Sequence, residues 1–234
     1  MLVREPETNI YLPIIGNQLS WLEEVGVPDL NATDELIQRV QRIEHGFKEI
    51  EREAKNIVEK NPVESSLSIS MKLYSSEVFQ SRSLATFILG EIASRSDEAL
   101  NFLKRTVGRD MSWQVQEILA KAFDKYCSDI GYEESLPTIK EWLQDGNPNV
   151  RRAVTEGLRI WTNREYFKDN PKVAVKLLSQ LKDDESGYVR KSVGNALRDI
   201  SKKHGDLIES ELKAWDTSDK KTKQVYKLAR RFLV

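Results

Sequence analysis

The chain has 234 residues, of which 39% are hydrophobic and 31% are charged, and this composition suits one or two domains or a single repeat array. Its one cysteine, Cys127, excludes a disulfide framework and is expected to be a packing residue. Two histidines leave little material for a metal centre or for Ser/Cys–His catalysis. The charged N-terminal residues do not resemble a signal peptide, and the apolar runs are too short to span a bilayer. We therefore expect a soluble cytoplasmic protein that needs no cofactor and no metal.

Charge is divided unevenly along the chain, although the formal net charge is −1. Residues 1–144 contain 16 Lys and Arg against 24 Asp and Glu, a net charge of −8, whereas residues 145–234 contain 20 against 13, a net charge of +7. Such an asymmetry indicates a polyanion-binding surface in the C-terminal part of the chain. The alternative is a solvated helical surface whose charges happen to be uneven.

The N-terminal region is predicted to lead into a helical array. Residues 1–32 contain three prolines and two glycines, which favour short helices and loops. From Thr33 to about Lys60 the apolar positions recur at helical spacing, Thr33 suits an N-cap, and Asn61-Pro62 ends the pattern. We therefore predict a lead-in over residues 1–32 and one long helix over residues 33–60, which begins an array over residues 33–234.

The rest of the chain is predicted to form five helix pairs. Apolar residues recur at spacings of three and four in each segment, and Gly or Pro residues interrupt the pattern at the joints. The predicted pairs are 62–74 with 78–93, 97–107 with 113–128, 132–143 with 148–161, 171–181 with 188–202, and 206–214 with 218–232. This is the pattern of an all-α, right-handed α–α superhelix, a HEAT-like solenoid whose concave face can hold an extended partner.

Two of the predicted second helices repeat each other. Residues 150–161 read VRRAVTEGLRIW and residues 189–200 read VRKSVGNALRDI, an offset of 39 residues that is close to the ~40-residue period of HEAT-type repeats. In the first segment, the apolar residues from Val150 to Trp161 fall on one helical face. Arg152, Glu156 and Arg159 fall on another face, which is where we look for function.

Three carboxylates occupy the second helices of three consecutive pairs. Because the pairs stack, Glu117, Glu156 and Asp199 can meet at one concave patch. Trp113 lies one turn before Glu117 and can stack on a sugar or a base. The polar residues on these helices that are candidates to bind a polyanion are Arg152, Arg159, Arg190, Lys191, Asn195 and Arg198. Alternatively, Glu156 merely pairs with its arginines along its own helix, for about 0.2–0.5 kcal/mol each.

These residues resemble a known superfamily. VRRAVTEGLRIW, VRKSVGNALRDISKKH and Trp113-Gln-Val-Gln-Glu117 are similar to the HEAT-like DNA glycosylases of bacterial alkylation repair, the AlkC and AlkD families, over roughly residues 65–210. The resemblance implies an enzyme that hydrolyses the N-glycosidic bond of cationic N-alkylated bases in duplex DNA without a cofactor. It also implies catalytic roles for Trp113, Glu117, Glu156 and Asp199. The same comparison implies that Arg152 and Arg198 contact DNA.

The sequence departs from the AlkD pattern at two positions. Asn195 stands where AlkD has a second tryptophan, and Glu117 stands where AlkD has an aspartate and AlkC has a glutamate. These motifs place the chain nearer AlkC than AlkD, and we expect a monomer that acts on alkylated duplex DNA in the bacterial nucleoid. Two other functions stay open: a protein that binds DNA structure without catalysis, and a scaffold for other proteins, which would have no salt-sensitive affinity for DNA.

Overall fold

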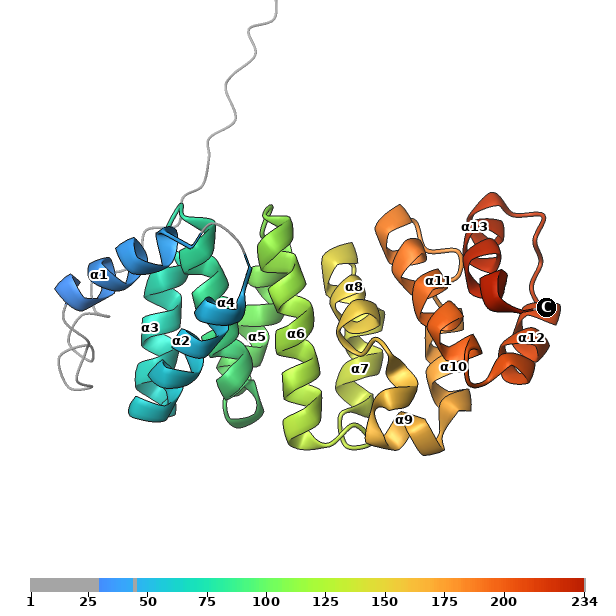
Figure 1. Cartoon of the computed structure of the whole chain (residues 1–234), viewed down its shortest axis with the longest axis horizontal. Helices are drawn as coiled ribbons and strands as arrows, with labels where there is room; N and C mark the ends of the chain where they lie inside the picture. The colour runs from blue at the N-terminus through green and yellow to red at the C-terminus, as the bar shows by residue number, and fades with distance from the viewer. Residues whose placement is uncertain (1–29, 44–45, 234) are drawn as a thin grey trace, which may run out of the picture.

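The computed structural model describes residues 30–43 and 46–233, and every regular element in these residues is a helix (Figure 1). The helices stack side by side along the long axis of the molecule, from α1 at one end to α12 and α13 at the other. This arrangement confirms the predicted all-α solenoid. Among the residues described, no helix combines the length and the apolar character that a membrane span requires.

The N-terminal end contains two helices where the sequence predicted one. Helix α1 spans Leu30–Gln41 and helix α2 spans Lys48–Lys60. Between them Gly46 has a φ of 82°, a left-handed backbone that a helix cannot continue through. The prediction of one helix over residues 33–60 was therefore wrong, because the apolar spacing continues across the turn. Most of the predicted lead-in, residues 1–29, lies outside the described residues.

Five helix pairs follow, within about one helical turn of the predicted bounds. The first helices are α3 (Val63–Tyr74), α5 (Asp97–Arg105), α7 (Leu136–Leu143), α10 (Pro171–Ser179) and α12 (Gly205–Lys213). The second helices are α4 (Phe79–Ile92), α6 (Trp113–Ile130), α8 (Pro148–Gly157), α11 (Gly187–Ser201) and α13 (Lys220–Ala229). Short 3₁₀ turns are η1 (Ala93–Arg95), η2 (Val107–Arg109), η3 (Trp161–Asn163) and η4 (Arg230–Phe232).

The second helices form a continuous row, in which α4 packs on α6, α6 on α8, α8 on α11, and α11 on α13. Apolar side chains of both helices of each pair fill the space behind this row. There the ring centroids of Phe123 and Trp142 lie 4.4 Å apart. Cys127 is fully buried, and burial raises the pKa of its thiol to about 12. The predicted packing role of Cys127 is therefore confirmed, and its thiol is unreactive at neutral pH.

Two contacts in the row depend on glycine. A Cβ atom on Gly157 would lie 2.3 Å from the carbonyl oxygen of Ala120, and one on Gly90 would lie 2.7 Å from the Cβ of Ala122. Both distances are far inside van der Waals contact, so α4 and α8 approach α6 where no side chain fits. This close approach brings the polar faces of the three helices together.

An arginine near the start of a second helix ties that helix to the turn before it. Arg151 donates from Nη1 to the Asp145 carbonyl at 2.7 Å and from Nε to the Asp184 carboxylate at 2.7 Å. One repeat later, Arg190 donates from Nη1 to the carbonyls of Asp184 at 2.5 Å and Glu185 at 3.0 Å. The first cation in each copy of the echoed motif is therefore used within the fold.

Helix α8 ends earlier than predicted. The predicted helix continued to Trp161, but α8 stops at Gly157 and Trp161 begins η3. Leu158 and Trp161 are nevertheless fully buried, so their assignment to the core is confirmed and the helical extent is wrong. Burial continues past the helix end, and apolar spacing alone therefore does not mark it. A short helix that the sequence did not predict, α9 (Glu165–Asp169), follows η3.

Candidate functional site

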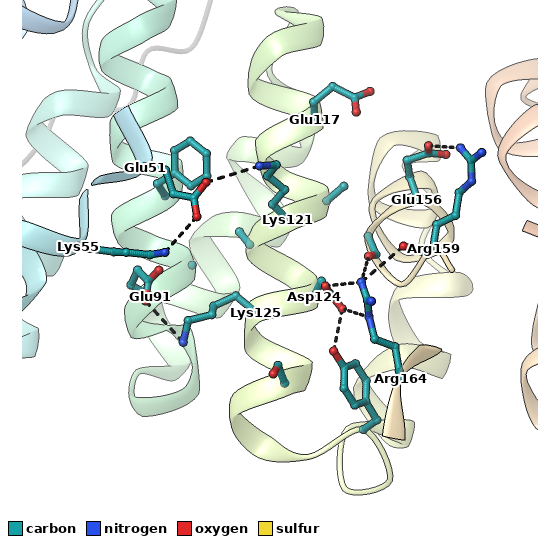
Figure 2. Close-up of a pocket in the computed structure, with 17 residues that line it drawn as sticks. Glu51, Lys55, Glu91, Glu117, Lys121, Asp124, Lys125, Glu156, Arg159 and Arg164 are labelled. Carbon is teal, nitrogen blue, oxygen red and sulfur yellow. Dashed lines mark hydrogen bonds and ion pairs between the residues drawn. The ribbon is translucent and has the colours of Figure 1, made fainter. Parts of the chain in front are cut away.

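An open hollow of about 620 Å³ lies between α2, α4, α6 and α8 (Figure 2). We call this surface the α2–α8 hollow. Its lining carries as many carboxylates as cations, so its charges cancel. The carboxylates are Glu51, Glu91, Glu117, Asp124 and Glu156, and the cations are Lys55, Lys121, Lys125, Arg159 and Arg164.

The N-terminal wall of the hollow is made of paired charges. Glu51 lies 3.1 Å from the Lys55 ammonium and 3.6 Å from the Lys121 ammonium. Burial acts to raise the pKa of Glu51, but the hydrogen bond from Lys55 and the charge of Lys121 outweigh it and lower that pKa. Lys125 lies 3.5 Å from Glu91 and also pairs with Asp129 on its own helix. The lysines on this wall therefore have carboxylate partners.

On the opposite wall, Arg164 fixes the end of α8 to α6. Its guanidinium donates to the two carboxylate oxygens of Asp124 at 2.9 and 2.6 Å and to the Gly157 carbonyl at 3.2 Å. Tyr132 donates to the same carboxylate at 3.0 Å, and burial together with the charge of Asp124 raises the pKa of this phenol. The segment that carries Arg159 is therefore held in place by α6.

Glu117 and Arg152 form an ion pair between α6 and α8. The Glu117 side chain is 38% exposed, so water screens the pair, and it contributes less than about 1 kcal/mol. Trp113, one turn earlier on α6, is 67% exposed, and its indole is accessible to a ligand. Of these two predicted catalytic residues, Glu117 lines the hollow and Trp113 lies toward the start of α6, at the rim of the row.

Arg159 joins the other two predicted carboxylates. Its Nη1 donates to Glu156 at 2.9 Å, and its Nε donates to Asp199 at 2.8 Å. The second oxygen of Glu156 accepts a 2.7 Å hydrogen bond from the Ser192 hydroxyl. Burial acts to lower the pKa of Arg159, but the hydrogen bonds to Asp199 and Glu156 outweigh it and raise that pKa. The packing of α8 on α11 thus brings Glu156 and Asp199 to one patch.

Asp199 is held by three cations and is only 7% exposed. Besides Arg159, the side chains of Arg198 and Lys202 each lie 3.3 Å from its Oδ1. Burial acts to raise the pKa of Asp199, but the hydrogen bond and charge of Arg159, with help from Lys202 and Arg198, lower it. We call Glu156, Arg159, Arg198, Asp199 and Lys202 the Asp199 cluster. Its cations outnumber its carboxylates, so it keeps a positive excess that the α2–α8 hollow lacks.

The remaining predicted DNA-binding residues lie on α11 and differ in how many donors they have free. The Arg190 guanidinium, which already donates to turn carbonyls, also donates from Nε to Gln224 at 2.9 Å. Lys191 is exposed and Asn195 is half-buried. The geometry therefore sets Lys191 apart from Arg190, because most of the donors of Arg190 are used within the protein.

Sequence reasoning missed charged residues in both regions. Lys202 follows Asp199 by three residues, and Lys121 follows Glu117 by four, so each lies on the same helical face as a carboxylate that the sequence had already singled out. That spacing was a usable signal for both lysines. The pair between Arg164 and Asp124 joins residues 40 apart in sequence, and no local pattern indicates it.

The fold and this site define a helical-repeat protein with a cation-rich patch around a buried carboxylate. The chain belongs to the DNA alkylation repair enzyme family, which it matches over residues 46–231. This family agrees with the resemblance found in the sequence.

Solved structures and a curated protein are similar to the chain. AlkD2 from Streptococcus mutans is 50% identical, with 86% of this chain and 97% of that chain covered and a TM-score of 0.84. The protein smu.31 from Streptococcus mutans UA159 is 46% identical, with coverages of 86% and 100% and a TM-score of 0.82. The uncharacterized protein YhaZ from Bacillus subtilis is 35% identical over 106 residues, which are 44% of this chain and 30% of YhaZ.

The similarity to AlkD2 extends over most of the chain, since half of the aligned residues are identical across nearly the whole of that protein. The placement nearer AlkC concerns individual motifs and rests on a few positions such as Glu117. It stays a prediction, because overall identity does not test those positions.

Proposed function

We propose that this protein hydrolyses the N-glycosidic bond of cationic N-alkylated bases in duplex DNA. Its membership of the DNA alkylation repair enzyme family supports this proposal. The observation that carries it is the Asp199 cluster, in which Arg159 hydrogen-bonds two carboxylates at 2.8 and 2.9 Å on a surface with a positive excess. Such a surface attracts DNA and presents negative charge close to the bound backbone.

The chemistry of the substrate matches this arrangement. A base alkylated at N3 or N7 is already cationic and leaves as a neutral molecule, so cleavage does not need a strong general acid. Positive charge then develops on the sugar, as in the oxocarbenium-like transition states of glycoside hydrolysis. A fixed carboxylate stabilises that charge. Asp199 is suited to this role because its lowered pKa keeps it ionised at neutral pH.

DNA phosphates compete for two of the cations that hold Asp199. The Lys202 side chain is 52% exposed and reaches solvent, and the Arg198 guanidinium lies beside it. When these cations turn toward phosphates, Asp199 keeps its hydrogen bond from Arg159 and its negative charge is less compensated. In this proposal Glu156 adds a second carboxylate. The exposed indole of Trp113, one turn before Glu117 on α6, stacks on a sugar or base.

A second candidate function is DNA binding without base excision. Each of the three predicted carboxylates accepts a hydrogen bond from an arginine, Glu117 from Arg152 and both Glu156 and Asp199 from Arg159. Carboxylates that pair with arginines across helices can serve the packing of the repeats alone. This observation favours a protein that uses the same cations to recognise DNA structure.

Single-turnover release of free base from a duplex with one N3- or N7-methylated purine separates the two functions. We expect release by the unmodified protein. Asp199→Asn and Glu156→Gln should keep or improve DNA affinity, because a carboxylate repels phosphate, while release slows about a hundredfold or more. The rate of release by Glu117→Gln should be intermediate, because Glu117 lines the α2–α8 hollow and lies outside the Asp199 cluster.

Each outcome of this experiment supports or contradicts one of the two functions. Full release by both Asp199→Asn and Glu156→Gln would remove these carboxylates from the mechanism. Tight binding without release by the unmodified protein would favour the second candidate, and a lack of salt-sensitive DNA affinity would contradict both. The proposal also has the protein act as a monomer at the bacterial nucleoid, which sedimentation and cell fractionation test directly.

A further inference from the structure

The C-terminal turn places an aromatic ring against two cations of the Asp199 cluster, Arg198 and Lys202. The turn η4 follows α13 and packs on α11. The centroid of the Phe232 ring lies 5.1 Å from the Lys202 ammonium and 5.9 Å from the Arg198 guanidinium carbon. Both distances are within the range of cation–π attraction. One ring therefore contacts both cations.

Each of these cations has a second partner and still has donors to spare. Arg198 and Lys202 both lie 3.3 Å from the Asp199 carboxylate. An ammonium carries three N–H donors and a guanidinium five, so one carboxylate does not occupy them all. The π face of the Phe232 ring attracts the cations without occupying any particular N–H donor. A phosphate can therefore bind both cations while the ring stays in place.

We propose that Phe232 is a positioning residue that holds Arg198 and Lys202 as a preformed pair for one DNA phosphodiester beside Asp199. This inference rests on the proposed binding of DNA. Long cationic side chains lose rotamer freedom when they bind a ligand, and an interaction that orders them beforehand increases affinity. The ring thus strengthens DNA binding without itself touching the DNA.

A packing role for Phe232 predicts a different result. Leu233 is partly buried and packs against the hydrophobic core, so it anchors the turn, whereas Phe232 is 50% exposed. The turn therefore has an apolar anchor that does not depend on the ring. If Phe232 acted through packing, a leucine of similar volume would replace it without loss.

The test compares Phe232→Leu with Phe232→Trp in duplex DNA binding. Leucine keeps apolar volume but lacks the ring, so we expect affinity to fall about two- to fivefold, and we expect tryptophan to restore it. In a Lys202→Met background Phe232→Leu should lower DNA affinity by a smaller factor, because the interaction between the ring and Lys202 is already absent. Tyr226→Leu is the matched control, since it removes a ring 5.5 Å from Arg230, outside the Asp199 cluster, and should leave affinity unchanged.

Nuclear magnetic resonance gives a second readout that does not need DNA. The methylene protons of Lys202 and Arg198 should show upfield ring-current shifts that Phe232→Leu abolishes and Phe232→Trp retains. Equal affinity of the leucine variant, an equal loss in Tyr226→Leu, or absent ring-current shifts would each overturn the positioning role. If the unmodified protein binds no duplex DNA, the proposed function fails and this inference falls with it. Normal binding with an unaffected leucine variant refutes the inference alone.

Discussion

The α2–α8 hollow and the Asp199 cluster are neighbouring regions built from the same kinds of residue, yet their charges are arranged differently. In the hollow, carboxylates and cations are equal in number and pair with one another, as Glu51 does with Lys121 and Asp124 with Arg164. In the cluster, Asp199 is buried and three cations surround it. Glu156 and Arg159 belong to both regions and form their border.

The difference shows what an ion pair between repeats can do. A balanced pair on a water-exposed surface contributes little energy, but it fixes how one repeat sits on the next. A buried carboxylate with several cations is a stronger structural element, and its unused positive charge attracts a polyanion. The charge split in the sequence follows this division, because the −8 segment supplies most of the hollow and the +7 segment supplies the cluster.

The largest expected effect comes from breaking the wall of the hollow. Gly157→Ala should lower the free energy of unfolding by about 3 kcal/mol, because the added Cβ would meet the Ala120 carbonyl oxygen at 2.3 Å and push α8 away from α6. Thermal and urea unfolding measure the change. Gly146→Ala is the matched control, since a Cβ there has nothing within 4 Å. Equal stability of the two variants would show that α8 can shift at little cost.

The two regions should differ in how much stability one carboxylate contributes. Asp199→Asn should lower the free energy of unfolding by about 2 kcal/mol, because it removes a buried acceptor from charged hydrogen bonds. Glu117→Gln should change it by less than about 0.5 kcal/mol, because the pair with Arg152 is screened by water. Urea unfolding at pH 7 checks both values. A cost for Glu117→Gln as large as that for Asp199→Asn would mean that the hollow also depends on its pairs.

Acid should weaken the cluster in a defined pH window. The pKa of Asp199 is lower in the folded protein than its ordinary value of 3.8, so its stabilising contribution is complete above about pH 5 and is lost as pH falls through the folded pKa. The stability difference between the unmodified protein and Asp199→Asn should therefore shrink below about pH 4. Urea unfolding at several pH values measures this difference. A difference that stays constant down to about pH 2 would mean that it does not arise from the ionised carboxylate.

The fold was predictable from the sequence because each helix pair carries apolar residues at helical spacing and polar breaks at its joints. Two helix ends were not predictable from that spacing. Apolar positions continue across Gly46, where the backbone turns, and burial continues from Leu158 to Trp161 after α8 has ended. The spacing of apolar residues indicates which residues are buried. It indicates a helix end only where burial ends at the same residue.

The candidate site was predictable as a patch but not as a set of pairs. The 39-residue echo placed Glu156 and Asp199 on neighbouring helices, and the structure joins them through Arg159. The same echo made Arg190 look equivalent to the exposed cations. Which cation of an adjacent pair turns back to the preceding loop depends on the path of that loop, and a single sequence does not contain that path.

The smallest expected effect concerns the salt dependence of DNA binding, and it tests the comparison most directly. Arg198→Met should reduce the slope of log affinity against log salt by about 0.9, the value for one lost phosphate contact on duplex DNA. Arg152→Met should reduce it by much less, because Glu117 already neutralises Arg152 and a phosphate must compete with that carboxylate.

The double variant Glu117→Gln with Arg152→Met is the control, since it removes both charges of the pair and should keep the slope of the unmodified protein. Fluorescence anisotropy with a labelled duplex, from about 50 to 200 mM salt, resolves slopes of this size. An equal loss of slope in Arg152→Met and Arg198→Met would show that Arg152 leaves Glu117 for a phosphate, so that the surface around Glu117 binds DNA as the cluster does.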